Sequence, residues 1–129
     1  MPTSFPTPPR AAGRRAAAVV VCVALVAVVA IAWIARRAEE AAIDRALAEG
    51  RVALEEGLAA RRRGESVAGI AGAFERARGA LDRATALAPA RPEPWFLRGR
   101  LRRALLRFDE ALADQDVALV RDAGFAPAL

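Results

Sequence analysis

The chain has 129 residues, of which 34 are alanine and 20 are arginine, and its formal net charge is +5. Hydrophobic residues make up 55% and charged residues 27%, so the chain is too apolar for a disordered protein. It contains no lysine, histidine or tyrosine, which excludes an imidazole base, a Schiff-base lysine and a phosphate-loop lysine. Alanine, leucine, arginine and glutamate all favour helices. We therefore expect an all-α protein that is not an enzyme and that uses no cofactor and no metal.

The first predicted segment is a disordered tail over residues 1–15, rich in proline and arginine. Its three arginines account for most of the net charge, and they suit anionic lipid headgroups. Because the basic residues are not concentrated on a folded domain, the composition predicts no nucleic-acid partner.

Residues 16–35, AAAVVVCVALVAVVAIAWIA, form a run of 20 residues without a charge. A helix of this length covers roughly 30 Å, which is the thickness of the bilayer hydrocarbon. Arginine pairs bound the run at both ends, and Trp33 lies near one end, where an indole suits the membrane interface. The run predicts one transmembrane helix. The alternative is a cleaved signal peptide, because Ala30-Ile31-Ala32 has the small-x-small form of a cleavage site.

The orientation of this helix is only weakly encoded, since arginines flank it in nearly equal number. A short N-terminal segment usually stays in the cytoplasm, so we expect the C-terminal part to be extracytoplasmic. Arginine without lysine is typical of a GC-rich bacterial genome. These observations predict a single-pass protein of the bacterial inner (cytoplasmic) membrane.

Residues 36–66 are expected to form an amphipathic juxtamembrane helix and a turn. Gly50 and Gly57 weaken this helix if they face solvent, or else they allow a second helix to approach closely. Arginines at 61–63 followed by Gly64 and Ser66 indicate a helix end, a left-handed cap and the N-cap of the next helix. The apolar positions of the helix are Ile43, Leu47, Leu54 and Leu58.

Three further helices are expected at about residues 67–88, 93 to 106 or 107, and 109–121. The first has apolar residues at alternating spacings of three and four, which places them in one stripe. Pro89 ends it, and two further prolines keep the following linker extended. No segment alternates polar and apolar residues for long enough to indicate a strand.

The region 67–129 resembles the tetratricopeptide repeat (TPR) family. Phe74 and Phe108 are 34 residues apart, and so are Ala77 and Ala111, which is the period of this repeat. The residues that carry the resemblance are Phe74, Ala77, Leu81, Ala84, Pro89, Trp95, Gly99, Phe108, Ala111 and Ala118.

The resemblance implies antiparallel helix pairs of the TPR-like α-solenoid type, in which small alanines let helices approach and large residues fill the layers between them. Arg98 and Arg102 stand where the family usually has leucine and tyrosine, so we expect Leu97 and Leu101 to take over the packing. Fewer than the usual three repeats are present, so the last helix should leave apolar surface open. Candidates for this surface are Leu112 and Leu119, which self-association or a partner would cover.

These features predict a membrane-anchored scaffold or adaptor that mediates protein–protein interaction. Four residues of the helix expected from residue 93 follow one another at intervals of four, three and four positions, so we expect their side chains to share one helix face. The arginines among them could bind an acidic peptide. The alternative to a binding site is a solvent-exposed basic face that binds no partner. The residues of this candidate site are Phe96, Arg100, Arg103 and Arg107.

A second functional hypothesis follows from the order of span, amphipathic helix and TPR-like repeats. This order resembles the extracytoplasmic half of some bacterial receptor-type serine/threonine kinases, although the chain carries no kinase motif. On that hypothesis it is a sensor segment. Asp114 and Asp116 are the nearest approach to a paired-carboxylate site, but two residues apart they point to different sides of a helix.

Overall fold

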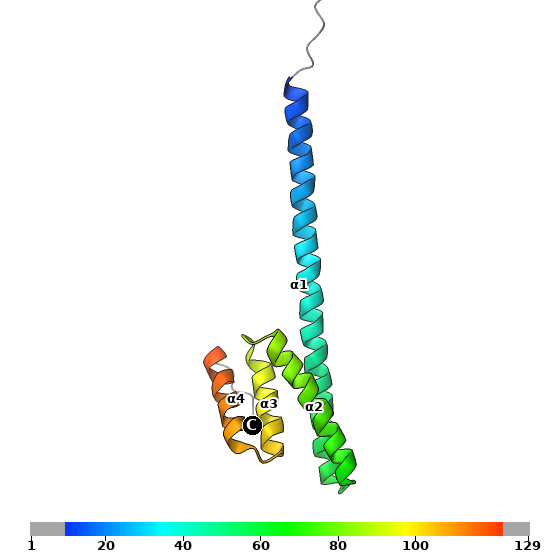
Figure 1. Cartoon of the computed structure of the whole chain (residues 1–129), viewed down its shortest axis with the longest axis vertical. Coiled ribbons are helices and arrows are strands. Elements are labelled where there is room, and N and C mark those ends of the chain that lie inside the picture. The colour runs from blue at the N-terminus through cyan, green and yellow to red at the C-terminus, as the bar shows by residue number, and fades with distance from the viewer. Residues whose placement is uncertain (1–9, 123–129) are drawn as a thin grey trace, which may run out of the picture. The chain divides into compact units, whose positions relative to one another are not determined.

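The computed structural model describes residues 10–122, and over this range it contains four α-helices and no strand (Figure 1). The chain divides into two compact units, Met1–Ala38 and Glu39–Leu129. The all-α prediction is confirmed, and each of the last three helices begins and ends within three residues of its predicted bounds. The helices are α1 (Arg10–Arg62), α2 (Val67–Leu87), α3 (Pro92–Ala104) and α4 (Phe108–Arg121).

The described part of the first unit is the beginning of α1. This helix starts at Arg10, so the predicted disorder of the tail is wrong for residues 10–15. Proline stops at position 9, and the alanines and arginines that follow have high helix propensities. Residues 1–9 of the predicted tail and residues 123–129 of the predicted repeat region lie outside the described residues.

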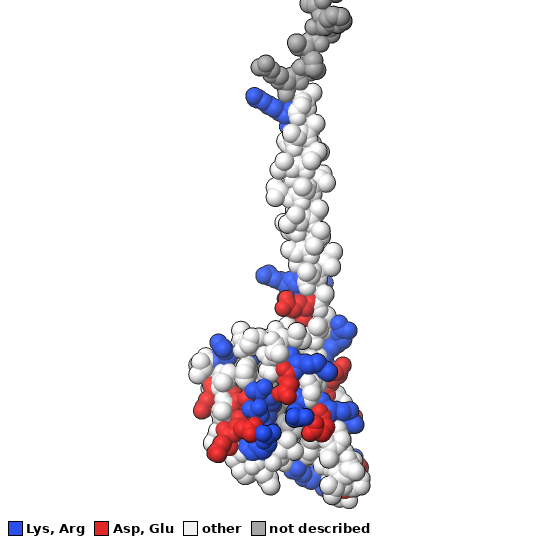
Figure 2. All heavy atoms as spheres, viewed as in Figure 1, with Lys and Arg blue, Asp and Glu red and all other residues white. Residues whose placement is uncertain are grey.

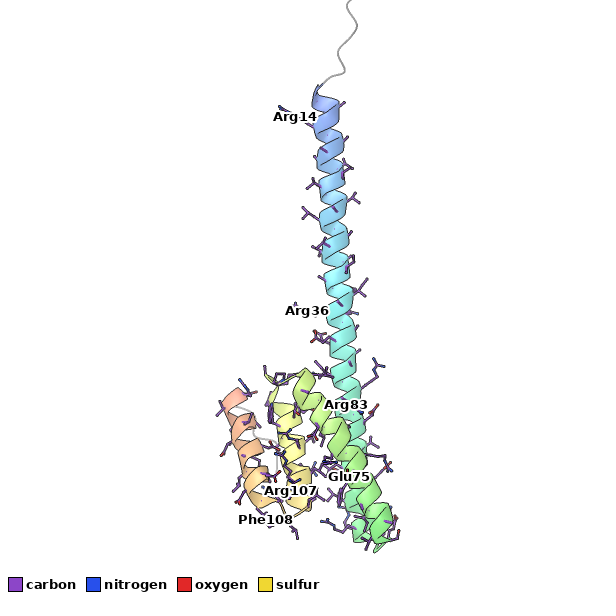
Figure 3. The ribbon with its side chains drawn as sticks, in the orientation of Figure 1. Arg14, Arg36, Glu75, Arg83, Arg107 and Phe108 are labelled. Carbon is purple, nitrogen blue, oxygen red and sulfur yellow. The ribbon has the colours of Figure 1, made fainter. Side chains whose placement is uncertain are left out.

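The apolar stretch of α1 is long and apolar enough to cross a membrane. Its best window has a mean hydropathy of 3.0, and no residue of that window is buried inside the protein. Figure 2 shows this stretch as an uncharged segment of α1, and Figure 3 labels Arg14 and Arg36 near its ends. At one end the guanidinium carbon of Arg37 lies 4.3 Å from the centroid of the Trp33 ring. This cation–π pair combines the two residue types that favour a membrane interface.

The second unit is built around one core to which three helices contribute. Leu54 of α1, Leu81 of α2 and Leu101 of α3 are each at most 1% exposed. Burying a leucine side chain completely contributes roughly 2 kcal/mol relative to leaving it in water. Leu97 and Leu101 are both buried and supply the contribution of α3 to this core. Helix α4 lies beside α3 (Figure 1).

Two glycines set how closely α1 and α2 approach. A Cβ atom added to Gly50 would lie 2.6 Å from Cδ2 of Leu81, and one added to Gly57 would lie 2.6 Å from Cδ1 of Phe74. Both glycines are buried, so the close-approach alternative is the correct one. The glycines are seven residues apart on α1 and their large partners are seven residues apart on α2, in the opposite chain direction. The two segments therefore pack as an antiparallel pair with a heptad register.

Most residues predicted to pack the repeats are buried, but Phe108 is not. It is 56% exposed, because it is the first residue of α4, at the outer end of the α3–α4 turn (Figure 3). Gly99 lies where α3 and α4 approach, since an added Cβ would be 3.2 Å from the carbonyl oxygen of Ala111. Trp95 is half-buried and Pro89 is exposed. The buried members are Phe74, Ala77, Leu81, Ala84, Gly99, Ala111 and Ala118.

The α2–α3 turn joins two residues that the repeat pattern singles out. The indole Nε1 of Trp95 donates a hydrogen bond of 3.0 Å to the carbonyl oxygen of Pro89. This carbonyl lies beyond the end of α2, where backbone acceptors have no helical partner. The tryptophan therefore fixes the path of the chain as it enters α3.

Left-handed residues follow the ends of both α1 and α3. Gly64 has a φ of 67°, and the Ser66 side chain accepts a hydrogen bond of 3.2 Å from the amide of Gly69; both agree with the predicted stop and N-cap. Leu106 has a φ of 63°, and the amide of Arg107 donates to the carbonyl of Arg102 at 2.8 Å. Helix α3 therefore ends at Ala104, two or three residues before its predicted end. A leucine stands at the left-handed position where glycine is usual.

We expect Leu106→Gly to raise the free energy of unfolding by about 1 kcal/mol, because a leucine in the left-handed region costs roughly 1–2 kcal/mol. Leu106 is exposed, so little packing is lost. The reciprocal change Gly64→Leu should cost about 1 kcal/mol, since open space surrounds Gly64 and only the backbone is affected. Urea unfolding of both variants measures the two effects, and a loss of stability in Leu106→Gly would contradict the prediction.

Candidate functional site

The candidate arginine face lies on α3, but only three of its four predicted members belong to that helix. Phe96, Arg100 and Arg103 are in α3, whereas Arg107 follows the left-handed Leu106 and precedes α4. The prediction that Arg107 shares their helix face is therefore wrong. The spacing of four that suggested it requires a continuous helix, and α3 has already ended at Ala104.

Two of the guanidinium groups are engaged within the protein. Nη2 of Arg100 lies 3.1 Å from Oε1 of Glu55 on α1, and Nη2 of Arg107 lies 2.7 Å from Oε1 of Glu110 on α4. Both pairs are partly exposed, so each contributes little to stability. An acidic ligand on this face would nevertheless have to compete with carboxylates that are already in place.

A buried carboxylate on α4 organises a cluster of charges that the sequence did not reveal. The Asp114 side chain is 4% exposed. Arg98 donates to it through Nε at 3.0 Å and Nη2 at 2.8 Å, and Arg102 donates through Nη1 at 2.9 Å. These are the two arginines that depart from the TPR pattern. Two-point arginine–carboxylate contacts are among the strongest hydrogen bonds in proteins, so the cluster ties α4 to α3.

Arg98 extends this cluster to α2. Its Nη1 lies 3.2 Å from Oγ1 of the buried Thr85 and 3.4 Å from Oδ1 of Asp82, and its guanidinium carbon lies 4.7 Å from the centroid of Trp95. The pKa of Arg98 is raised above its ordinary value, chiefly by the hydrogen bond to Asp114, although burial opposes the shift. The guanidinium therefore stays charged at physiological pH. Because it joins α2, α3 and α4, this cluster has a structural role.

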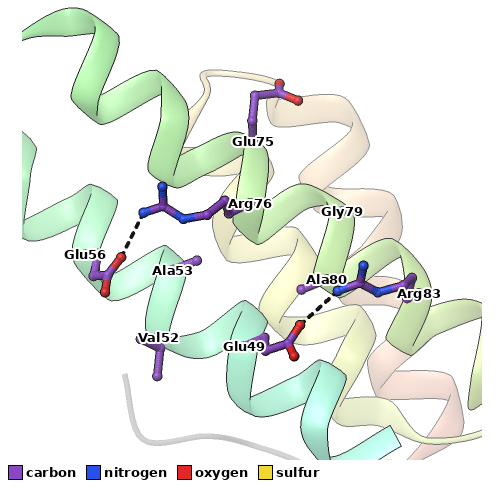
Figure 4. Close-up of a pocket in the computed structure, with 9 residues that line it drawn as sticks. All are labelled: Glu49, Val52, Ala53, Glu56, Glu75, Arg76, Gly79, Ala80 and Arg83. Carbon is purple, nitrogen blue, oxygen red and sulfur yellow. Dashed lines mark hydrogen bonds and ion pairs between the residues drawn. The ribbon is translucent and has the colours of Figure 1, made fainter. Parts of the chain in front are cut away.

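A groove of about 500 Å³ lies between α1 and α2 (Figure 4). Small side chains line its floor, and two ion pairs cross between the helices: Glu49 with Arg83 at 2.9 Å, and Glu56 with Arg76 at 3.0 Å. Figure 4 shows Glu75 directed away from these pairs. Since both lining arginines are already paired with carboxylates, the groove offers no unpaired cation for an anionic ligand. Its other lining residues are Val52, Ala53, Gly79 and Ala80.

The outer surface of α4 is apolar and exposed. Leu112 is 57% exposed and Leu119 is 50% exposed, which confirms the prediction that the last helix leaves these leucines uncovered. Phe108 is also exposed. Spacings of four and seven residues place all three on one face of a helix. Several exposed apolar side chains on one helix face are typical of sites where proteins contact one another.

The described residues hold no candidate metal centre. No group of three or more histidine, cysteine, aspartate or glutamate side chains in residues 10–122 is arranged to hold a metal ion. Comparison with known proteins adds no assignment: no family model, curated protein or solved structure matches the chain.

Proposed function

We propose that the chain is a membrane-anchored scaffold whose second unit docks another protein through the outer face of α4. The observation that carries this proposal is the exposure of Phe108, Leu112 and Leu119 along one face of a helix. Removing such a face from water is favourable in proportion to its apolar area. The apolar stretch of α1 supports the anchoring part of the proposal.

We further propose that the second unit is a short TPR-like array. The 34-residue spacing supports this assignment, as do the buried alanines of α2 and α4 and the bond between Trp95 and Pro89. In a repeat array each helix pair covers the exposed face of its neighbour. The uncovered face of α4 is then a docking surface of the array, and non-enzymatic binding is the function that fits it.

The proposed location is the bacterial inner membrane, with the second unit on the extracytoplasmic side. We expect the full chain to remain in the membrane fraction after carbonate extraction, because an uncharged run of 20 residues favours a spanning helix. Immunoblots of the pellet and supernatant measure the result. A shortened soluble protein whose N-terminus is Trp33 would instead establish the signal-peptide alternative.

Docking itself is tested by site-specific photocrosslinking in the membranes of cells that make the protein. A photoreactive residue replaces Leu112 in one variant and Val67 in a control, since Val67 is exposed on α2, far along the chain from α4. We expect discrete crosslinked species at position 112 and none at position 67. Equal crosslinking at both positions, or none at 112, would contradict docking by the α4 face.

A further inference from the structure

The surface of α4 carries two parallel rows of side chains. The apolar row consists of Phe108, Leu112 and Leu119, all of which are exposed. Beside it on the helix lie Asp109 and Asp116, which are also exposed and are seven residues apart. At 100° per residue, the acidic row lies about 70° around the helix axis from the apolar row. One partner helix can therefore contact both rows at once.

The two carboxylates of the acidic row differ from most other exposed carboxylates of the second unit, although Glu39 and Glu40 of α1 likewise form no ion pair among the described residues. Glu49, Glu56 and Glu75 each form an ion pair with an arginine. Over residues 10–122, Asp109 and Asp116 form no ion pair or hydrogen bond through their side chains. Asp109 lies in the first turn of α4, where a negative charge favours the helix. Asp116 lies in the middle of the helix and gains no such benefit.

A second copy of α4 would not supply the missing cations. In an antiparallel pair related by a twofold axis, the acidic row of one copy would face the acidic row of the other. In a parallel pair, the acidic row of one copy would instead face the other side of the apolar row on the second copy, where Gln115 lies. Like charges placed opposite one another are unfavourable, and glutamine offers no charge. The charge pattern of α4 therefore favours a different partner.

We propose that the α4 face binds an amphipathic helix whose apolar stripe is flanked by lysine or arginine, an inference that rests on the proposed docking function. The apolar stripe of the partner covers Phe108, Leu112 and Leu119, and its cations pair with Asp109 and Asp116. Helix-in-groove recognition of this kind takes its affinity from the apolar anchors. The charges determine which helices are accepted and make binding sensitive to salt.

The test uses the full chain in nanodiscs of zwitterionic lipid and two designed peptides. Both peptides form the same leucine-striped helix, but one has lysine and the other has glutamate along the flank. Fluorescence anisotropy measures their Kd values, with empty nanodiscs as the blank. We expect the lysine peptide to bind at least tenfold more tightly than the glutamate peptide, and this preference to shrink in 0.5 M salt.

Variants identify the residues responsible. The double change Asp109→Arg and Asp116→Arg should reverse the preference between the peptides. The matched double change Asp44→Arg and Glu75→Arg alters the net charge equally on α1 and α2, and it should leave the preference unchanged. Leu112→Ser should abolish binding of the lysine peptide, whereas Val67→Ser, at an even more exposed apolar position on α2, should not.

Three outcomes would overturn the inference. If both peptides bind equally well and Leu112→Ser abolishes both, the α4 face docks helices without selecting by charge, and the proposed docking function survives. If the full chain forms a dimer that Leu112→Ser dissociates, a second copy occupies the face. If neither peptide binds, the partner chemistry is wrong, and crosslinking at position 112 decides separately whether the face docks a protein at all.

Discussion

Replacing Asp114 with alanine is expected to lower the free energy of unfolding of the second unit by about 3 kcal/mol, because removing one partner of a buried ion pair leaves the other charge uncompensated. Here Arg98 and Arg102, whose side chains are 16% and 23% exposed, would lose their shared carboxylate. The matched control is Asp116→Ala, two residues away on the same helix but exposed and without an ion pair among the described residues. It should change stability by less than about 0.5 kcal/mol.

Urea unfolding of the full chain in nanodiscs measures both effects. With Trp33 changed to phenylalanine, Trp95 is the remaining tryptophan, and its fluorescence reports on the cluster because Arg98 lies over its ring. A double-mutant cycle of Arg98→Ala and Asp114→Ala should give a coupling free energy of about 1.5–3 kcal/mol. If Asp114→Ala costs no more than Asp116→Ala, the cluster does not hold α4 in place.

The features that the sequence predicted correctly are those encoded by neighbouring residues. Helix ends at Gly64 and Ser66 follow from a left-handed glycine and a serine cap, which act within one turn of the chain. The apolar stretch of α1 follows from composition alone. The exposed leucines of α4 could also be predicted, because a helix with apolar residues on two sides can bury only one of them against α3.

The features that the sequence did not predict depend on contacts between distant residues. Asp114 is buried because Arg98 and Arg102 reach it from another helix, 16 and 12 residues away. Spacing along α4 alone could not distinguish it from Asp116. The two arginines at positions where the TPR pattern has apolar residues were the available signal, since charges on a packed surface require a buried partner.

The end of α3 was mispredicted for a related reason. No glycine marks it, because Leu106 adopts the left-handed conformation and the Arg102 carbonyl accepts the amide of Arg107. The candidate arginine face therefore lost Arg107, which the helical spacing had included. The acidic row of α4 was not predicted either. Asp109 and Asp116 can be recognised as unpaired carboxylates only once the structure shows which other carboxylates form ion pairs.

Glycine-to-alanine changes should have opposite effects on the two sides of the α1–α2 pair. We expect the double change Gly50→Ala and Gly57→Ala to lower the free energy of unfolding by about 4 kcal/mol, since overpacking a tight core costs roughly 1–3 kcal/mol per site. The new methyl groups would meet Leu81 and Phe74. Both of these side chains are buried, so they cannot move aside without disturbing other contacts.

The matched control is the double change Gly72→Ala and Gly79→Ala on α2. These glycines are also seven residues apart in a helix, but nothing lies within 4 Å of an added Cβ at either position. Alanine is favoured over glycine in a helix by about 1 kcal/mol per site, so this variant should be more stable than the parent by about 1–2 kcal/mol. Urea unfolding followed by Trp95 fluorescence compares the two variants directly. If both double changes shifted stability in the same direction, the heptad register of α1 against α2 would be wrong, because that register alone gives the two glycine pairs opposite surroundings.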